Sequence, residues 1–428
     1  MRGVLISAPS SNQGKTVISV GLLGLLRSKF GQDAIVGAKA GPDYIDTAYL
    51  GTSTSVGLNL DPWAMRKETI AQLLQRQSSP MLLVEGTMGL FDGSIDAGRG
   101  SSADLAKLLN MPLILVVNAG GISQSAAAIV HGFASLDPSV NVAGVIFNRV
   151  GSARHESMLR QAMAKLDVPV LGAVPRSADL DLDSRHLGLV QAGDQISVQQ
   201  AQTQWADALR PHVDLDAIAN IMAPVSTEVT AEAPIFHLAH GRRLAIADDA
   251  AFRFCYGHWK HTDAQTFSPL ANQPVPQDAE FVFLPGGYPE LHLPALARAD
   301  VFWCSLRAAA DAGVPIYGEC GGYMVLGRGI QDDSGAWTQT AGLLPFTTSF
   351  QQRRRHLGYR RIEALKDTRL SGVGARFRGH EFHYCSIIEQ EEPTLFRATD
   401  AQGENEGKHG HSAGSVFGSF MHLIDQEA

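Results

Sequence analysis

The sequence predicts a two-domain α/β protein, and three observations lead to that prediction. Short apolar, β-branched runs alternate with amphipathic stretches from residue 1 to about residue 195. This alternation weakens between about 195 and 241 and then starts again. Each half also carries a glycine-containing loop between a predicted strand and a predicted helix. Alternation of this kind is typical of domains with a mostly parallel, buried sheet.

The expected elements follow from these patterns. In the first half the expected strands are Val4–Ala8, Ile35–Lys39, Met81–Val84, Leu113–Asn118, Val142–Asn148 and Val170–Val174. Helical spacing occurs over Thr16–Lys29 and Ser101–Leu109. In the second half the first expected strands are Arg243–Ala247, Phe281–Leu284 and Pro315–Gly318. We therefore predict domains over residues 1–195 and 241–428, joined by a linker over 196–240.

The composition excludes several classes of protein. Of 428 residues, 45% are hydrophobic and 18% are charged, and the formal net charge is −8. A negative charge argues against a general nucleic-acid surface, which needs excess Lys and Arg. No apolar run approaches the ~18 residues of a membrane span, and the N-terminal apolar stretch is too short for a secretory signal. The four cysteines are widely spaced, so we expect reduced thiols in a cytoplasmic protein.

A phosphate-binding loop is predicted at Ser10–Thr16, between the first strand and the first helix. Backbone N–H groups around Gly14 and the helix dipole would converge there on one anion. Lys15 would neutralise the β- and γ-phosphates, and Thr16 would reach Mg²⁺. Pro9 stands where the common phosphate loop has its first glycine, so a chance Gly-Lys-Thr at a helix start is the alternative.

Two acidic clusters follow predicted strands in the first half. Asp43 and Asp46 come just after the strand that ends at Lys39. Glu85 ends another predicted strand, and Asp92 lies in the glycine-rich loop that follows. Ligands of open α/β sheets bind at the carboxyl ends of strands, and Mg²⁺ prefers hard oxygen ligands. We therefore expect a magnesium site there, with a solvated carboxylate or a helix cap as the alternative for each acid alone.

A second loop, Gly318–Gly322, is predicted to turn sharply from a strand into a helix. At the helix N-terminus Cys320 is expected to be favoured as a thiolate, with Gly321 offering a backbone N–H to an oxyanion. Gly286 and Gly287 follow another predicted strand and are expected to supply a further oxyanion donor. A buried, inert cysteine is the alternative, and it is our interpretation of the other three cysteines.

A catalytic thiol needs a base, which can lie far away in the sequence. His422 follows a predicted strand near the C-terminus and is the leading candidate. His380 and His383 compete with it. Metal binding by that pair is the weaker interpretation.

At these residues the chain resembles the corrinoid a,c-diamide synthases, the cobyrinic and hydrogenobyrinic acid branch of the cobyric-type amidotransferases. The resemblance covers essentially the whole chain. It rests on Ser10–Thr16, KAGPDYID (39–46), NLDPW (59–63), VEGTMGLFDG (84–93), PGGYPE (285–290) and GECGGYMVLG (318–327). It implies a P-loop NTPase-like N-terminal domain similar to dethiobiotin synthetase and a C-terminal class I glutamine amidotransferase α/β domain.

The resemblance also implies an activity. Such an enzyme is an ATP-dependent, glutamine-hydrolysing ligase that amidates the a and c carboxylates of a polycarboxylate corrinoid through acyl phosphates, in cobalamin biosynthesis. Cys320 carries over as the thiol nucleophile and His422 as its base. The other carried-over sets are Gly14, Lys15, Thr16 and Lys39 for ATP, Thr16, Glu85 and Asp46 for Mg²⁺, and Asp43, Asp46 and Asp92 for the substrate or intermediate.

Two positions depart from the family pattern. Ile424 stands where typical class I glutaminases carry a Glu, which implies a Cys-His dyad or a triad completed elsewhere. Asn12–Gln13 replaces the small residues that are commoner in the phosphate loop, so the nucleotide preference is less secure.

Alternatives to this function stay open at the level of sequence. Hydrogenobyrinic acid is preferred over cobalt-containing cobyrinic acid on overall resemblance, and another tetrapyrrole is a further alternative. A different class is a non-enzymatic nucleotide switch, against which the GECGG loop and His422 argue. The sequence leaves the oligomeric state open, a homodimer included.

Overall fold

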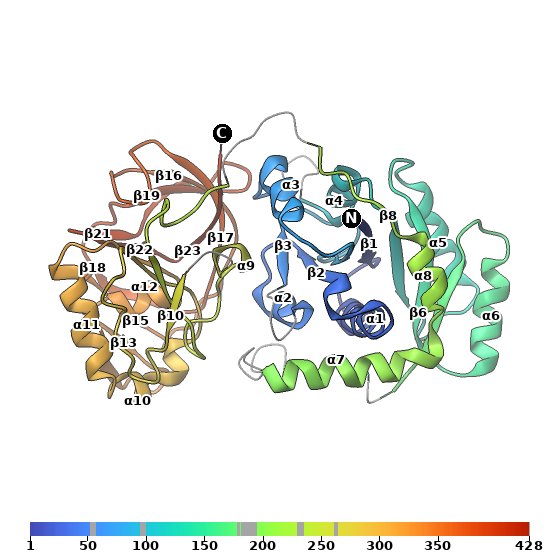
Figure 1. The fold of residues 1–428 in the computed structure, drawn as a ribbon, viewed down its shortest axis with the longest axis horizontal. Helices are drawn as coiled ribbons and strands as arrows, with labels where there is room; N and C mark the ends of the chain where they lie inside the picture. The colour runs from blue at the N-terminus through green and yellow to red at the C-terminus, as the bar shows by residue number, and fades with distance from the viewer. Residues whose placement is uncertain are drawn as a thin grey trace. The chain divides into compact units, whose positions relative to one another are not determined.

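The computed structural model describes residues 1–51, 57–94, 100–177, 180, 195–228, 235–260 and 264–427. The chain divides into two compact units (Figure 1). Unit 1 comprises Met1–Trp63 and Lys67–Ala233, and unit 2 comprises Ala64–Arg66 and Pro234–Ala428. Both units are α/β, as predicted. Within the described residues, no helix combines the length and the apolar character needed to cross a membrane.

The described part of unit 1 is built on one sheet, in the order β3-β2-β4-β1-β5-β6-β7. These strands pair in parallel, and β8 adds an antiparallel pair with β1. The strands are β1 (Arg2–Ser7), β2 (Ile35–Ala40), β3 (Leu58–Leu60), β4 (Met81–Glu85), β5 (Leu113–Asn118), β6 (Val142–Val150), β7 (Val170–Pro175) and β8 (Ala223–Pro224). The six strands predicted here are confirmed, while β3 and β8 were missed because each has only two or three residues.

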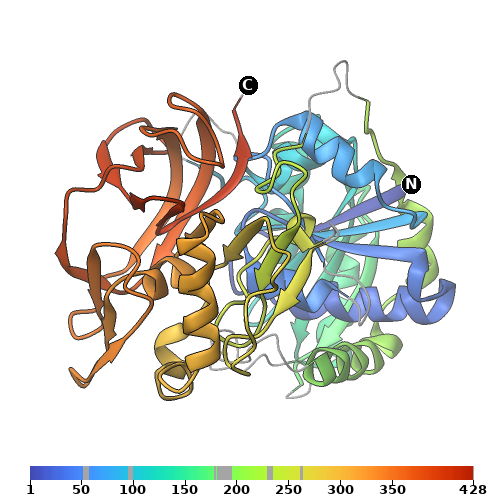
Figure 2. The same cartoon turned by 60° about the vertical axis from the view of Figure 1, so that its left-hand side comes forward.

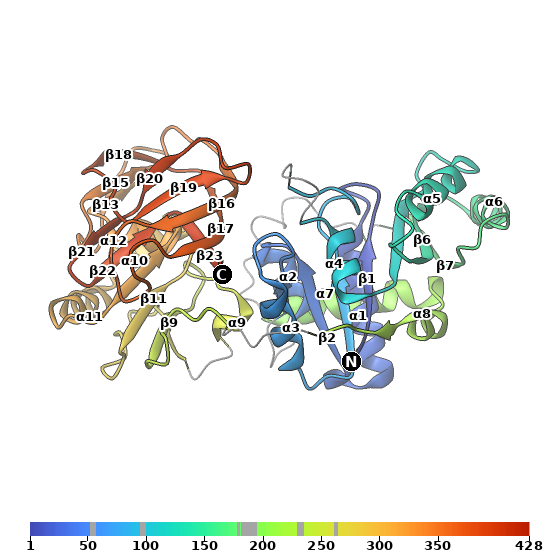
Figure 3. The same cartoon turned by 90° about the horizontal axis from the view of Figure 1, so that it is seen from above.

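Helices flank this sheet. They are α1 (Lys15–Phe30), α2 (Tyr44–Leu50), α3 (Lys67–Gln75), α4 (Ser102–Leu109), α5 (Ser125–Ser135), α6 (Ala153–Met163), α7 (Gln195–Leu209) and α8 (Leu215–Ile221), with short 3₁₀ turns η1 (Gln32–Ala34) and η3 (Arg210–His212). α4 starts at a capping box in which Ser101 and Asp104 satisfy each other's backbone N–H. Figure 3 shows α5 and α6 beside β6 and β7.

Helix α7 lies along α1 and belongs to unit 1 (Figure 1). α1 is apolar on most of its surface, so it must be covered on the side away from the sheet. Trp205 and Leu209 of α7 are buried in the same core, and the Gln202 amide donates to the backbone oxygens of Tyr49 and Gly51. Much of the predicted linker over 196–240 is therefore folded onto unit 1. Its residues 229–234 lie outside the described residues.

The central sheet of unit 2 has the order β10-β9-β11-β12-β22-β21. Its pairs are parallel except for β21 with β22. The strands are β9 (Leu244–Ala247), β10 (Gln265–Phe267), β11 (Phe281–Leu284), β12 (Ile316–Glu319), β21 (His411–Ala413) and β22 (Val416–Ser419). Helix α11 (Asp300–Asp311), gold in Figure 2, buries Phe302, Trp303 and Leu306 in the core of this unit. The other helices are α9 (Gly257–Lys260), η4 (Pro289–His292), α10 (Leu293–Leu296) and α12 (Gly321–Leu326).

Two further sheets follow in unit 2. An antiparallel sheet has the order β20-β19-β16-β17-β23, and a smaller one has the order β14-β13-β15-β18. Their strands are β13 (Gly329–Gln331), β14 (Trp337–Gln339), β15 (Phe346–Ser349), β16 (His356–Ala364), β17 (Arg376–His383), β18 (Ser386–Gln390), β19 (Phe396–Asp400), β20 (Gly407–His409) and β23 (Met421–Gln426). Only Phe420 separates β22 from β23, so the chain passes from the parallel sheet into the antiparallel sheet just before His422.

Leu209→Ala tests whether α7 is part of the core of unit 1. Leu209 is fully buried, and a Cβ on Gly21 of α1 would lie 2.3 Å from its Cδ1. We expect the variant to lose about 2–5 kcal/mol of unfolding free energy, measured by urea denaturation, because truncation leaves a cavity. The control is Arg210→Ala, an exposed neighbour, which should change stability by at most about 0.5 kcal/mol. Equal, small effects in both variants would contradict this packing.

Candidate active sites

The loop between β1 and α1 places Lys15 at the start of that helix. The preceding Gly14 has φ 88°, and a Cβ there would lie 2.2 Å from the Asn148 side-chain nitrogen, so the residue must lack a side chain. Lys15 is buried, and its Nζ donates to the backbone oxygen of Met88 at 2.5 Å. Burial and the nearby Lys39 ammonium lower the pKa of Lys15 to about 8. A bound anion would oppose both effects, so the loop is suited to phosphate.

The predicted acids and lysines meet at the carboxyl ends of β2 and β4. Thr16 Oγ1 donates to Glu85 Oε1 at 2.7 Å. Lys39 Nζ lies 2.9 Å from the same carboxylate oxygen and 2.5 Å from Asp46 Oδ2. Asp43 caps α2 by accepting a hydrogen bond from the backbone N–H of Asp46 at 2.8 Å. Sequence reasoning placed these residues at strand ends, and the structure brings them into one network.

Burial sets the electrostatics of this network. Burial alone would lower the pKa of Lys39, but Glu85 and Asp46 outweigh it and raise that pKa. Burial raises the pKa of Glu85 to about 7, opposed by the Lys39 ammonium. Carboxylates that lie close together and away from water repel each other, so binding of a proton or a cation is favoured there.

The oxygens of this network fit a magnesium ion. Glu85 Oε2 is buried and has no hydrogen-bond partner among the described residues. Together with Thr16 Oγ1 and the Asp46 carboxylate it makes a set of hard oxygen donors, the kind Mg²⁺ takes when it also binds phosphate. Lys39 lies between the two carboxylates and balances part of their charge.

A cavity of about 460 Å³ adjoins these residues. Its walls include all the predicted nucleotide and metal residues, and also Asn148, Arg149, Pro175 and Arg176, which sequence reasoning missed. These four lie at the carboxyl ends of β6 and β7. Their position after predicted strands was the sequence signal that could have identified them as cavity residues. Asp92 is not part of this lining. Its carboxylate accepts a hydrogen bond from the backbone N–H of Gly89 at 3.0 Å, within its own loop.

The second loop turns from β12 into α12 at Cys320. This residue has φ 49° and ψ −108°, a strained conformation for a residue with a side chain. Its backbone N–H donates to Ser419 on β22 at 2.9 Å, which holds the turn in place. A strained residue between a strand and a helix is typical of a nucleophile elbow.

The thiol of Cys320 is buried, and the expectation that it is favoured as a thiolate is wrong for the free protein. Burial and then the Glu290 carboxylate raise the pKa of Cys320 to about 12. Backbone N–H groups of Gly321 and Gly287 point at the sulfur and oppose this rise only in part. Helix α12 has six residues, so its dipole is too weak to offset burial. The thiol therefore needs a base.

His422 on β23 lies near Cys320, whose thiol donates a hydrogen bond to the backbone oxygen of Phe382 at 3.4 Å. A Cβ on Gly286 would lie 2.4 Å from His422 Cε1 and 3.3 Å from both His422 Nε2 and Cys320 Cβ. Gly286 therefore provides the space in which the ring reaches the elbow, while its role as an oxyanion donor stays a prediction. On the other side of the ring, His422 Nδ1 lies 3.7 Å from Glu319 Oε2. The His380 ring stacks on His422 with centroids 4.7 Å apart.

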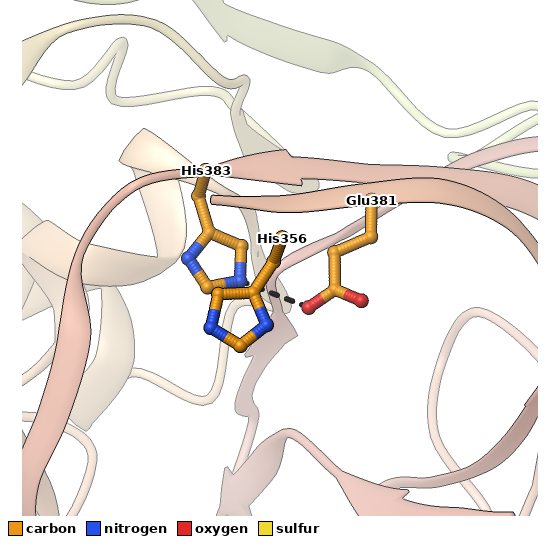
Figure 4. Close-up of side chains that lie close together, drawn as sticks. All are labelled: His356, Glu381 and His383. Atoms are coloured by element: carbon orange, nitrogen blue, oxygen red, sulfur yellow. Dashed lines mark hydrogen bonds and ion pairs between the residues drawn. The ribbon is translucent and has the colours of Figure 1, made fainter. Parts of the chain in front are cut away.

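The competing histidines are held by other partners. His380 Nδ1 lies 3.0 Å from the Tyr256 hydroxyl, and burial lowers the pKa of His380 to about 3. His383 Nε2 lies 2.9 Å from Glu381 Oε1, and His356 stacks on its ring (Figure 4). The planes of these two rings differ by 5°, so their nitrogen lone pairs do not converge on one point. Ligand atoms of His356, Glu381 and His383 nevertheless lie within 4.8 Å of one another, so metal binding at this cluster stays the weaker interpretation beside stacking and hydrogen bonding.

The fold and the two loops define a class: a nucleotide-binding domain and a glutamine amidotransferase domain in one chain. Residues 4–190 match the CobQ/CobB/MinD/ParA nucleotide binding domain, and residues 258–428 match the CobB/CobQ-like glutamine amidotransferase domain. A hydrogenobyrinate a,c-diamide synthase of Brucella anthropi is 47% identical over 99% of this chain and 99% of its own. Those of a Sinorhizobium species and Rhodobacter capsulatus are 44% and 42% identical, over 99% of this chain and 99% and 98% of theirs. The chain belongs to the hydrogenobyrinate a,c-diamide synthase family and is an amidating ligase.

Lys39→Met tests how the buried acids of unit 1 are held. The change leaves Glu85 and Asp46 with side chains 0% and 14% exposed and no ammonium between them. We expect a loss of about 3–5 kcal/mol of unfolding free energy at pH 8, measured by urea denaturation. Without Lys39 the pKa of Glu85 rises further above its ordinary 4.5. Its protonation then restores stability at low pH, so the loss should be smaller at pH 5 than at pH 8.

The matched control for this variant is Lys107→Met. Lys107 pairs with partly exposed Asp104 and Asp137, so its removal should cost at most about 1 kcal/mol. A deficit in Lys39→Met that does not change with pH would contradict the assigned role of Lys39.

Proposed function

We propose that this protein uses ATP and glutamine to amidate the a and c carboxylates of hydrogenobyrinic acid, in cobalamin biosynthesis in the cytoplasm. The observation that carries the proposal is that one chain combines a cavity suited to phosphate with a loop that places Cys320 near His422. This chain is similar over its full length to hydrogenobyrinate a,c-diamide synthases. Cobyrinic acid is the alternative acceptor, and a homodimer stays a prediction.

In unit 1 the phosphates of ATP would bind Gly14, Lys15 and Thr16. Thr16, Glu85 and Asp46 would hold Mg²⁺, which when bound supplies positive charge that balances the phosphate oxygens. A carboxylate oxygen of the corrinoid attacks the γ-phosphorus and ADP leaves, which gives an acyl phosphate. Ammonia then attacks the acyl carbon, loses a proton and expels phosphate, which gives the amide.

The acids near the cavity have a second proposed role. Asp43 and Asp46, with Asp92 in the adjoining loop, would organise the substrate or the acyl phosphate. Asp43 is exposed at the cavity wall, and its carboxylate accepts a hydrogen bond from the backbone N–H of Asp46.

In unit 2 the nucleophile would be Cys320. Its thiol proton moves to His422 Nε2, and the sulfur attacks the side-chain amide carbon of glutamine. The N–H groups of Gly287 and Gly321 would donate to the resulting oxyanion. His422 returns the proton to the leaving nitrogen, ammonia departs, and a thioester remains. Water hydrolyses this thioester to glutamate and restores the thiol.

The reaction is tested by incubating the protein with ATP, Mg²⁺ and glutamine and with either hydrogenobyrinic or cobyrinic acid. We expect hydrogenobyrinic acid to gain two amide groups, detected by product mass. If only cobyrinic acid were converted, cobyrinic acid would replace hydrogenobyrinic acid as the proposed acceptor. Glutamine hydrolysis without amidation of either would discard both acceptors.

A pair of variants separates the two sites. Cys320→Ser should lose glutamine hydrolysis by at least about 10³-fold but keep amidation driven by added ammonium chloride, because only the ammonia source is removed. Lys15→Ala should lose both glutamine- and ammonia-driven amidation, because its charge serves the phosphates. The measurements are glutamate release and amide formation. Loss of ammonia-driven amidation in Cys320→Ser would argue against this division of labour.

A further inference from the structure

We propose that Glu319, the residue directly before the nucleophile, completes the glutaminase site by orienting His422 and balancing its charge. Glu319 would thus be a positioning residue that acts through His422. The inference rests on the proposed roles of Cys320 and His422. It fills the place left by Ile424, which occupies the position of the usual third triad member.

The Glu319 carboxylate is held by two donors from different strands. Its Oε1 accepts a hydrogen bond from the Tyr317 hydroxyl at 3.0 Å and another from the backbone N–H of Leu423 at 2.9 Å. Leu423 directly follows His422 on β23, so the carboxylate is tied to the strand that carries the base. The other oxygen, Oε2, lies 3.7 Å from His422 Nδ1, and both side chains are at most 2% exposed.

The two edges of the imidazole have different neighbours. A Cβ on Gly286 would lie 3.3 Å from both His422 Nε2 and Cys320 Cβ, so the Nε2 edge lies on the side of Cys320, whose thiol donates to the backbone oxygen of Phe382 at 3.4 Å. The Nδ1 edge faces Glu319. At 3.7 Å the contact is an ion-pair distance and not a hydrogen bond, but an ionised carboxylate there favours the tautomer with the proton on Nδ1, which leaves the Nε2 lone pair available for the thiol proton. A carboxylate is therefore placed where a glutaminase base needs one.

The environment gives this carboxylate a specific task. Burial lowers the pKa of His422 well below its usual value and raises that of Cys320 to about 12, so a thiolate and an imidazolium are costly to form here. A negative charge at Nδ1 offsets the cost of the imidazolium.

Other buried carboxylates of the antiparallel sheet have other partners. Both oxygens of Asp425 bond to Arg66, at 2.9–3.1 Å. Glu381 bonds to Arg360 and to His383. Glu319 is the carboxylate that an ion-pair distance joins to His422.

The direct test is Glu319→Gln in the full-length protein, assayed for glutamine hydrolysis and for ammonia-driven amidation. The amide keeps the size of the side chain and an oxygen for Leu423 N–H, but it removes the charge. We expect kcat for glutamine to fall roughly 100-fold with KM changed less than about threefold, and ammonia-driven amidation to be retained. A kcat for glutamine within about threefold of the wild type would overturn the proposal.

The pH profile separates positioning from a structural role. The titratable groups that face Glu319 are Tyr317, Cys320, Cys255 and His422, with His380 behind the His422 ring. Burial raises the pKa of Glu319 to about 8, so its ionised form gains population as the pH rises. Wild-type kcat/KM for glutamine should therefore rise between pH 6 and 8, and Glu319→Gln should lose this rise. An unchanged profile in the variant would count against the proposal.

Asp425→Asn is the matched control, because it removes a buried carboxylate from the strand of His422 without touching Nδ1. We expect it to lower stability but to keep the pH-dependent rise of kcat/KM. Loss of the rise in this variant as well would show that any buried charge near β23 has the same effect, and would overturn the specific role of Glu319.

A measurement on the wild type decides the case in which Glu319→Gln does not fold, which would appear as loss of both activities. Histidines are labelled with ¹⁵N, and the signals of His422 are assigned by their absence in His422→Gln. The proposal requires the Nδ1–H tautomer at pH 8, and the Nε2–H tautomer would overturn it. Because glutamate release reports this site alone, failure to amidate either corrinoid would refute the proposed acceptor and leave the test of Glu319 intact.

Discussion

Burial of ionisable groups is the constraint on which both sites depend. In unit 1 burial pushes the pKa of Lys15 down and that of Glu85 up. In unit 2 it raises the pKa of the Cys320 thiol and lowers that of His422. In each case the free protein disfavours the charged form that the chemistry needs. Under the proposed function this charge comes from a partner: phosphate and a cation in one unit, and a neighbouring carboxylate in the other.

The scaffold makes such burial tolerable by keeping the polar groups at strand ends. Residues inside a parallel sheet are covered on both faces, so a charge is accommodated only where the strand stops. Lys39, Glu85 and Asn148 are at or near the ends of their strands, next to the phosphate loop. Glu319 ends β12, and Cys320 occupies the turn that follows it. The same topological rule thus positions two unrelated chemistries.

The sequence predicted most of this arrangement, because apolar strand runs and loop motifs are local signals. All nine predicted strands are present, and the family predicted from the motifs is confirmed by full-length relatives. The course of α7 was not predicted, because few apolar residues mark its buried face and its packing partner α1 is about 180 residues away. Arg149 and Arg176 were missed because nothing local marks which strand ends border one cavity. The thiol pKa was misjudged because burial is a property of the whole fold.

In the proposed glutaminase site the carboxylate comes from Glu319 at the end of β12, and not from β23, the strand of the base. The pairing of β17 with β23 shifts register after Leu423: Gly379 pairs with Leu423 and Arg378 with Asp425, so Ile424 is the extra residue of a β-bulge. Here Ile424 is 1% exposed and is part of the apolar packing. The backbone N–H of Leu423, between His422 and Ile424, instead anchors a carboxylate that arrives from β12. The base and its carboxylate thus remain coupled through β23, and the nucleophile follows that carboxylate directly in sequence. In the proposed site, the short segment Glu319–Cys320 thus supplies both the carboxylate and the thiol that act with His422.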